Sequence, residues 1–287
     1  MAERPHPRVP PRPTDRPLRL TWRWRVIAGI IIAAVNLVRW RIHVRGLEHV
    51  PERGGAVLAF NHHSYVDFTM LAWPIVRRRK RPVRFLAKRE IWSSRKAGWV
   101  VRWGEAVPVD RGSATARAGA FSAAIEALRH GDLVAVAPEQ TISPSFELLP
   151  FRTGAARMAQ GAGVPIVPVI GWGSHRALTK GAAPRLRFGL PVTVHFGEPL
   201  WVGPDDDVVA VTAALQVRME ALLAEEQRRY PDGLPAGAAW VPATLGGGAP
   251  PHAEILAAHE ARADGWEHRD RERDRRPDGP IGEASAG

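Results

Sequence analysis

A histidine and a carboxylate lie close together in residues 61–67, a segment that directly follows the apolar run 56–60. An imidazole takes up a proton near neutral pH, and a neighbouring carboxylate selects its tautomer and stabilises the imidazolium that forms. A histidine of this segment, His62 or His63, and Asp67 are therefore suited to act together as a general base. The chain has no cysteine, and it lacks the Gly-x-Ser-x-Gly turn that presents a serine nucleophile. We therefore expect the base to activate a hydroxyl group of the substrate.

Spacing alone favours His63 as the partner of Asp67. His63 and Asp67 are four residues apart, and that spacing places two side chains on one face of a helix. His62 is suitable only if it precedes the first helical turn and reaches back over it, with Asp67 about one turn into the helix. From spacing alone, both histidines also remain open as surface or helix-capping residues.

Three more blocks follow along the chain. Residues 104–111 are Gly-Glu-Ala-Val-Pro-Val-Asp-Arg, residues 137–143 are Ala-Pro-Glu-Gln-Thr-Ile-Ser, and residues 164–169 are Val-Pro-Ile-Val-Pro-Val. With the His-x4-Asp pair, they resemble in order and spacing the blocks of the glycerolipid acyltransferases, the lysophosphatidic acid acyltransferase family. The third block is similar to that family's Phe-Pro-Glu-Gly-Thr-Arg-Ser. The resemblance extends from about Val44 to Pro199.

The resemblance implies a reaction in which His62 is the general base and Asp67 its partner. An acyl group passes from an acyl-CoA or acyl carrier protein thioester to the free hydroxyl of a lysophospholipid. The expected acceptor is 1-acyl-glycerol-3-phosphate, which gives phosphatidic acid. Backbone N–H groups near residues 167–169, or at the helix start after Asn61, are the expected donors to the oxyanion. No covalent acyl-enzyme is expected, no cofactor beyond the acyl donor, and no metal, because a ligand pattern such as His-Glu-x-x-His is missing from the sequence.

The resemblance also implies a set of substrate-binding residues: Arg111, Glu139, Thr141 and Arg152. An arginine is expected because its planar fork binds phosphate oxygens through two parallel hydrogen bonds, and Arg111 matches the family's second block. Glu139 is expected to hydrogen-bond the glycerol of the acceptor or to hold an arginine in place.

The third block departs from the family pattern at two positions. Gln140 stands where the family has glycine, and Ile142 stands where it has arginine. Arg152 and Arg157 are the nearby cations that would replace the missing one. Two alternatives therefore remain: an acyltransferase of the same family with another lysolipid acceptor, and an inactive family member that binds lipid.

The chain carries a formal net charge of +11, from 40 basic and 29 acidic residues. This balance favours an anionic partner: a nucleic acid, a membrane surface or a phosphorylated substrate. Because the sequence has the four blocks and none of the usual nucleic-acid-binding motifs, we expect anionic lipid and no nucleic acid. The basic run 77–81, with Arg84 and Lys88, is open as a contact for lipid headgroups, as a contact for the phosphates of coenzyme A, or as a solvated face.

The N-terminal region divides into two parts. Residues 1–20 are rich in proline and arginine and predict a disordered basic arm. Residues 21–41 predict a membrane-associated helix, whose apolar run 26–38 spans roughly 20 Å and is short for a bilayer core of about 30 Å. Tryptophan and arginine at both ends are typical interface anchors. We expect a peripheral or monotopic protein at the cytoplasmic face of the cell membrane, with a buried core helix as the alternative.

Residues 42–230 predict one acyltransferase domain of the α/β class, with a mixed sheet flanked by helices. The expected strands are 57–60, 83–87, 106–109, 133–137, 166–170 and 192–196. The expected helices are 65–78, 93–103, 114–129, 154–162 and 208–229. Residues 231–287 are expected to be a mostly irregular or disordered tail with a short helix at 253–263.

Overall fold

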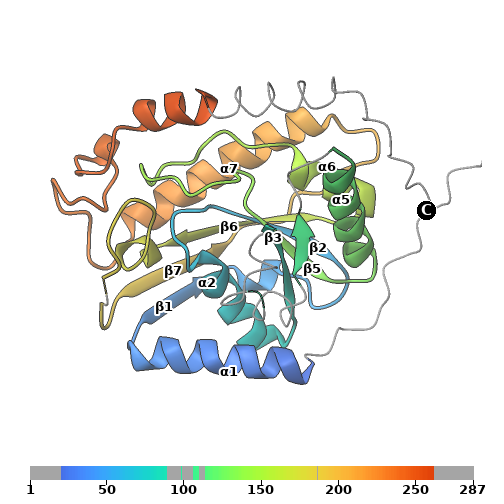
Figure 1. Cartoon of the computed structure of the whole chain (residues 1–287), viewed down its shortest axis with the longest axis horizontal. Coiled ribbons are helices and arrows are strands. Elements are labelled where there is room, and N and C mark those ends of the chain that lie inside the picture. The colour runs from blue at the N-terminus through green and yellow to red at the C-terminus, as the bar shows by residue number, and fades with distance from the viewer. Residues whose placement is uncertain (1–20, 89–97, 99–105, 110–113, 186, 262–287) are drawn as a thin grey trace, which may run out of the picture.

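A seven-stranded mixed sheet forms the centre of the molecule (Figure 1). The structure is a computed structural model that describes residues 21–88, 98, 106–109, 114–185 and 187–261. The strand order is β1-β7-β6-β2-β5-β3-β4. Neighbouring strands pair in parallel, except that β6 and β7 are antiparallel. The strands are β1 (Arg41–Arg45), β2 (Ala56–Phe60), β3 (Val83–Lys88), β4 (Val107–Val109), β5 (Leu133–Val136), β6 (Ile166–Trp172) and β7 (Pro191–Phe196).

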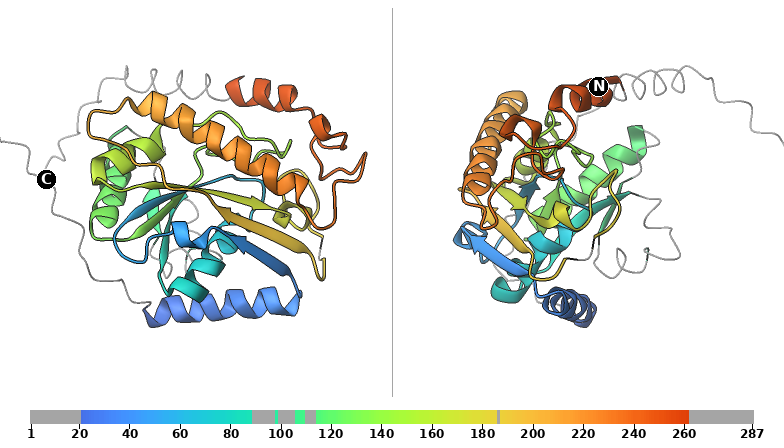
Figure 2. Two further views of the ribbon diagram at one scale, coloured as in Figure 1. Left: turned by 180° about the vertical axis from the view of Figure 1, so that it is seen from behind. Right: turned by 90° about the vertical axis from the view of Figure 1, so that its left-hand side faces the viewer.

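Helices cover both faces of this sheet (Figures 1 and 2). Helices α5, α6 and α7 lie on one face, and α1 and α2 lie on the other. The helices are α1 (Trp22–Leu37), α2 (Asp67–Pro74), α5 (Ala114–Arg129), α6 (Gly154–Ala162) and α7 (Val208–Arg228), with a π turn η2 (Ile75–Arg79) and short 3-10 turns η1 (Leu47–His49), η3 (Ser174–Arg176) and η4 (Ala243–Leu245). The predicted mixed α/β architecture is therefore confirmed.

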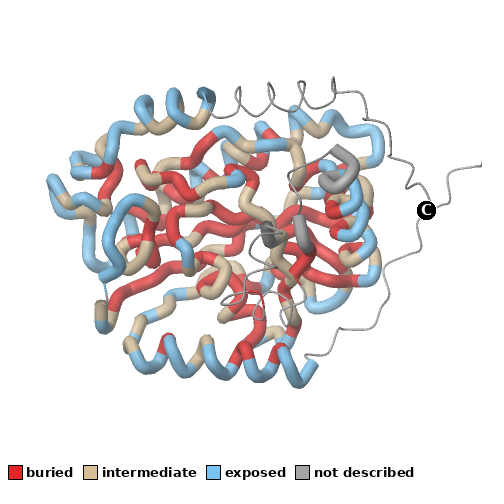
Figure 3. Tube along the Cα trace, viewed as in Figure 1, coloured by how far each residue is buried: buried red, intermediate tan, exposed pale blue. Residues whose placement is uncertain are grey.

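Strand β2 is buried over its whole length, which explains its unbroken apolar sequence (Figure 3). Successive side chains of a strand point to opposite faces of the sheet. Val57 and Ala59 pack into the core under α5, α6 and α7. Leu58 and Phe60 pack into the core on the side of α1 and α2. A strand covered on both faces has no polar side, so it is apolar at every position.

Two differences between the predicted and the observed elements have a clear physical cause. Strand β1 was not predicted, because only Ile42 and Val44 in its five residues are apolar and it lies at the edge of the sheet. The helix predicted at 65–78 begins at Asp67 instead and widens after Pro74 into the π turn. Proline lacks the N–H that continues an α-helical ladder, and this is a common cause of such irregularity. The helix predicted at 93–103 and the basic arm 1–20 lie outside the described residues.

Helix α1 packs one side against the domain and exposes the other. Trp24 and Ala28 form a small buried cluster with Val76 of η2, and Val35 joins the core beneath the sheet. The opposite side is exposed, so α1 is buried on one side only. In the part of the chain that the structure describes, no helix combines the length and the apolar character needed to cross a bilayer.

Arg81 lies inside the domain and not on the basic surface to which the sequence assigned it. Its side chain donates to the carbonyls of Pro51, Gly54 and Gly131, and only 2% of the residue is exposed. Burial lowers the pKa of its guanidinium to about 10. Arg81 thus ties the turn before β2 to the turn after α5.

We predict that Arg81→Ala lowers the free energy of unfolding by about 3 kcal/mol, because three carbonyls lose their donor in a poorly solvated place. Urea titration followed by circular dichroism measures this loss. The matched control is Arg53→Ala, which removes an exposed arginine from the same turn and should change stability by less than about 0.5 kcal/mol. Equal effects of the two substitutions would contradict the prediction.

Candidate active site

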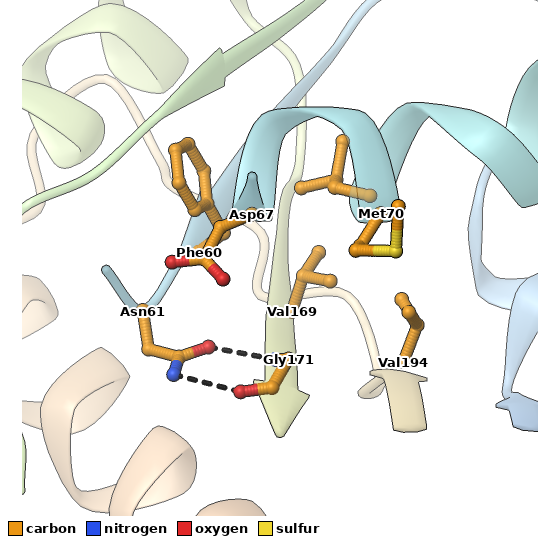
Figure 4. Close-up of a pocket in the computed structure, with 8 residues that line it drawn as sticks. Phe60, Asn61, Asp67, Met70, Val169, Gly171 and Val194 are labelled. Atoms are coloured by element: carbon orange, nitrogen blue, oxygen red, sulfur yellow. Dashed lines mark hydrogen bonds between the residues drawn. The ribbon is translucent and has the colours of Figure 1, made fainter. Parts of the chain in front are cut away.

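The candidate site lies where β2, β5 and β6 end. These three strands are parallel, so their carboxyl ends meet at one edge of the sheet, the usual place for a site in this class of fold. Asn61 joins two of them: its Nδ2 donates to the carbonyl of Gly171 at 3.0 Å, and its Oδ1 accepts from the N–H of Gly171 at 2.7 Å (Figure 4). The segment that begins at residue 61 is thereby attached to the end of β6.

The carboxylate of Asp67 accepts four hydrogen bonds. Its Oδ2 accepts from the backbone N–H of His63 at 2.8 Å, from the backbone N–H of Ser64 at 2.7 Å, and from Nδ1 of His62 at 3.2 Å. Its Oδ1 accepts from the hydroxyl of Ser174 at 2.8 Å. An ionised carboxylate only accepts, so Nδ1 of His62 carries the proton and Nε2 keeps its lone pair. The imidazole is thus held in the tautomer that a general base requires.

The structure brings the ring of His62, and not the ring of His63, to the carboxylate. His62 precedes α2, as its role requires, although Asp67 is the first residue of that helix and does not lie one turn inside it. The ring of His63 is fully buried, and its Nδ1 lies 3.0 Å from Nδ2 of Asn61. Burial, with a smaller effect of the neighbouring His175, lowers the pKa of His63 to about 3. His63 therefore stays neutral, while the His62 side chain is 13% exposed and packs edge-on against Phe68.

Glu139 connects the third block to the backbone of the histidine. Its Oε1 accepts from the N–H of His62 at 2.8 Å, and its Oε2 accepts from the N–H of Leu149 at 3.0 Å. The residue is fully buried, and burial raises the pKa of its carboxyl to about 8. Both oxygens thus hold backbone groups in place, whereas contact with substrate remains a prediction for this residue.

The loop that contains the third block runs alongside residues 61–66. The N–H of Ser143 donates to the carbonyl of His62 at 2.9 Å. Gln140, which replaces the family's glycine, has φ +60°, a conformation that glycine adopts without strain. Ile142, which replaces the family's arginine, is buried at 5% exposure. This position therefore offers an apolar contact to the interior and no cation to a substrate.

The other predicted binding residues are dispersed. Thr141 is half-buried beside Glu139, and Arg152 and Arg157 are exposed at the start of α6. The backbone N–H of Arg152 donates to the carbonyl of Pro138 at 3.1 Å, so its side chain begins next to the third block. Arg111 lies outside the described residues.

The backbone N–H groups of residues 61–67, which lead into α2, already have acceptors within the protein. The N–H groups of residues 61–67 donate in turn to the carbonyl of Val169, to Glu139, twice to Asp67, to the carbonyl of Leu178, and to the side chain and carbonyl of Ser64. These groups are therefore not available to an oxyanion, because the turn surrounds the carboxylate of Asp67 and directs its donors inward. Residues 167–169, the other expected source, lie inside β6 between two neighbouring strands.

A small cavity borders the carboxylate of Asp67 (Figure 4). Its volume is about 10 Å³, which is room for about one water molecule. It is too small to hold an acyl chain. The lining residues are Phe60, Asn61, Asp67, Met70, Leu71, Val169, Gly171 and Val194.

Among the described residues, one group of possible metal ligands joins β7 to α7. His195, Glu225 and Glu226 have ligand atoms within 4.8 Å of one another. The guanidinium of Arg45 lies 3.3 Å from Glu226 and 3.5 Å from Glu225, so an arginine already neutralises these carboxylates. The group is accounted for as an ion-pair cluster.

Two residues of the site were missed from the sequence. Ser174 follows Asp67 by 107 positions, lies in a short 3-10 turn and belongs to none of the four blocks. Asn61 directly precedes the first block, but nothing in the sequence shows that its amide pairs with the end of another strand. Only the folded topology brings Ser174 to Asp67 and Asn61 to Gly171.

Comparisons with known proteins agree with this site. Residues 41–172 match the family model described as Acyltransferase. The chain is 29% identical over 201 residues to a 1-acyl-sn-glycerol-3-phosphate acyltransferase of Limnanthes alba, which is 67% of each chain. It is 27% identical over 149 residues to the enzyme of the same name in Pseudomonas aeruginosa, which is 52% of each chain.

A solved structure shows the same fold. The 1-acyl-sn-glycerophosphate (LPA) acyltransferase PlsC from Thermotoga maritima aligns with a TM-score of 0.61 at 23% identity, over 72% of this chain and 80% of that one. Fold, blocks and family model together define the class of the protein as an acyltransferase enzyme. Within that class, the chain is similar to the 1-acyl-sn-glycerol-3-phosphate acyltransferases of lipid biosynthesis, in agreement with the resemblance found in its sequence.

We predict that Glu139 makes the protein less stable as pH rises from 5 to 8. The raised pKa of its carboxyl means that the folded state keeps a proton that the unfolded state has lost above about pH 4.5. Unfolding therefore releases a proton and becomes easier with pH, by up to about 1.4 kcal/mol per pH unit. Urea titrations at each pH should show the advantage of wild type over Glu139→Gln shrinking across this range. The exposed Glu198→Gln is the control, and a constant difference between wild type and Glu139→Gln would contradict the prediction.

Proposed function

We propose that this enzyme transfers a fatty acyl group from an acyl-CoA or acyl carrier protein thioester to the free hydroxyl of a lysophospholipid, with 1-acyl-glycerol-3-phosphate as the acceptor. The observation that carries the proposal is the hydrogen bond between Nδ1 of His62 and the buried carboxylate of Asp67. This bond leaves Nε2 as the proton acceptor in a partly exposed position. The relatives named above are enzymes that act on this acceptor.

The proposed reaction is a direct transfer. Nε2 of His62 takes the proton of the acceptor hydroxyl, and the oxygen attacks the thioester carbonyl. The tetrahedral intermediate collapses by breaking the C–S bond, and the imidazolium returns the proton to the departing thiolate. Asp67 stabilises the imidazolium during this cycle and remains ionised throughout.

The acceptor phosphate is proposed to lie near the third block and the start of α6. Arg152 and Arg157 are exposed there, and Thr141 and Arg111 are the further proposed ligands. Because Ile142 is buried and uncharged, this enzyme has one cation fewer than the family pattern. Comparing 1-acyl-glycerol-3-phosphate with lysophospholipids of larger headgroup therefore tests the acceptor separately from the reaction.

We predict that His62→Ala lowers kcat at least 100-fold, since the reaction loses its base. Asp67→Asn should lower kcat by about 100-fold, since the imidazolium loses its negative partner, while an amide can still accept from the two backbone N–H groups. Both are measured as transfer of a radiolabelled acyl group in mixed micelles. The control is His43→Ala, which removes an exposed histidine of β1 and should retain the wild-type rate. A wild-type kcat in either site variant would contradict the assignment of His62 as the base and Asp67 as its partner.

Helix α1 is proposed to lie in the surface of a membrane. Its exposed side carries Trp22 (61% exposed), Val26 (42%), Ile30 (53%) and Leu37 (76%). The spacing of these residues places them along one side of the helix. Such an apolar stripe suits the boundary between headgroups and acyl chains.

Basic residues flank this stripe. Arg23 and Arg25 are exposed on α1 itself. Arg77, Arg78 and Lys80 are exposed on or next to η2, and η2 is placed beside α1 by the packing of Val76 against Trp24. Each such charge near an anionic surface contributes about 1 kcal/mol. We therefore assign Arg77, Arg78 and Lys80 to contact with lipid headgroups at a cytoplasmic membrane face.

We predict that Ile30→Glu lowers binding to phosphatidylglycerol vesicles at least tenfold, because a charge replaces an apolar group in the proposed contact. Vesicle sedimentation measures the bound fraction. Val217→Glu is the matched control, since it places the same charge at an exposed valine of α7 (64% exposed). Equal binding of the two variants to the vesicles would contradict the proposal that α1 contacts the membrane.

A further inference from the structure

The C-terminal residues 231–252 form an ordered segment, here named the C-terminal strap, which packs on the domain. It lies on the side of the molecule opposite to α1 (Figures 1 and 2). Val241 and Ala249 are buried, and residues 237–249 close on themselves through backbone hydrogen bonds. The family model ends at residue 172, so the strap lies outside the part of the chain that defines the family.

The strap contacts the loop of the third block through two side chains. The hydroxyl of Thr244 donates to Oε1 of Glu147 at 2.7 Å. Nδ1 of His252 lies 2.9 Å from the hydroxyl of Ser145, which is fully buried. The two contacts lie on either side of Phe146.

A third contact fastens the strap next to the site. The carbonyl of Trp240 accepts from Nε2 of His175 at 3.0 Å, and the guanidinium of Arg176 lies 4.2 Å from the centre of the Trp240 ring. Both partners belong to η3, which also contains Ser174, the donor to Asp67.

The loop between these contacts is strained. Gln140 and Phe146 both have φ +60°, which is uncommon for a residue with a side chain and least favourable for a bulky one. Such conformations persist only where surrounding contacts enforce them. The ring of Phe146 is buried against His175, with centroids 4.4 Å apart. The strap forms hydrogen bonds with Ser145 and Glu147, the residues on either side of Phe146.

The same loop holds the backbone of the proposed base and carries the proposed acceptor ligands. The hydroxyls of Ser145 and Ser143 are 3.0 Å apart, and the N–H of Ser143 donates to the carbonyl of His62. A continuous chain of hydrogen bonds thus runs from His252 through Ser145 and Ser143 to the carbonyl of His62.

We propose that the C-terminal strap holds the loop 138–152 in its strained, substrate-binding conformation, with His252 and Thr244 as positioning residues. The substrate part of this proposal rests on the proposed function. His62 keeps its own partner in Asp67, so loss of the strap contacts should loosen the acceptor ligands of the loop more than the base.

The test is the double variant Thr244→Val/His252→Ala. Hydrogen exchange of residues 143–149 in the full chain should become at least tenfold faster. KM for 1-acyl-glycerol-3-phosphate should rise about fivefold, while kcat and KM for the acyl donor change less than twofold. Replacing His252→Ala by His252→Asn in the double variant retains a hydrogen-bonding group near the position of Nδ1. This change should restore most of the exchange protection and most of the acceptor KM. Glu254→Ala, exposed on the helix formed by residues 252–261, is the control and should behave as wild type.

A second variant tests the role of strain. Gln140→Gly relieves the left-handed conformation without removing a buried side chain, because Gln140 is exposed. Added to the double variant, it should recover at least half of the lost exchange protection.

The outcomes separate this proposal from the proposed function. Unchanged exchange in the double variant overturns the strap proposal, whether or not the protein transfers acyl groups. A fall in kcat at unchanged acceptor KM also overturns it, because that pattern reports a smaller fraction of folded enzyme. Faster exchange in a protein without acyl transfer to any lysophospholipid would support the mechanical role of the strap and remove the substrate assignment.

Discussion

The buried carboxylate of Asp67 is the interaction on which the rest of the site depends. Placing a charge at 4% exposure is costly unless donors surround it, and here four donors do. Two are backbone N–H groups, one is an imidazole and one is a hydroxyl. Satisfying this one group therefore determines the shape of residues 62–66, the start of α2 and the position of η3.

Glu139 has a different electrostatic character from Asp67, although both are buried carboxyls that accept backbone N–H bonds. Asp67 has four donors, one of them an imidazole. Glu139 has two backbone donors, and burial dominates its pKa. One carboxyl is thus arranged to remain charged beside the base, and the other connects the loop to the base with little charge near neutral pH. Two negative charges next to one imidazole would oppose its return to the neutral form after each transfer.

Much of the fold was predictable because its central elements have strong local signals. Strands β2, β5 and β6 are short apolar runs, and the boundaries of α5 and α6 agree with the prediction. His62 was identified as the partner of Asp67 through the resemblance of the four blocks, since spacing alone favoured His63. Ser174, the interior position of Arg81 and the contacts of the C-terminal strap were not, because each depends on residues that are distant in sequence. The strap was expected to be irregular since glycine, proline and alanine dominate it, yet closely packed turns also require such residues.

Gln140 has a consequence for exchanging parts of this chain with those of its relatives. A glycine at that position would let the loop take its conformation with less strain. With glutamine, the loop depends more on the contacts that residues more than a hundred positions away make with it. The domain and the C-terminal strap should therefore not behave as interchangeable modules. A chimera that joins residues 1–230 of this chain to the tail of a relative would keep the strained loop without the residues that contact it here.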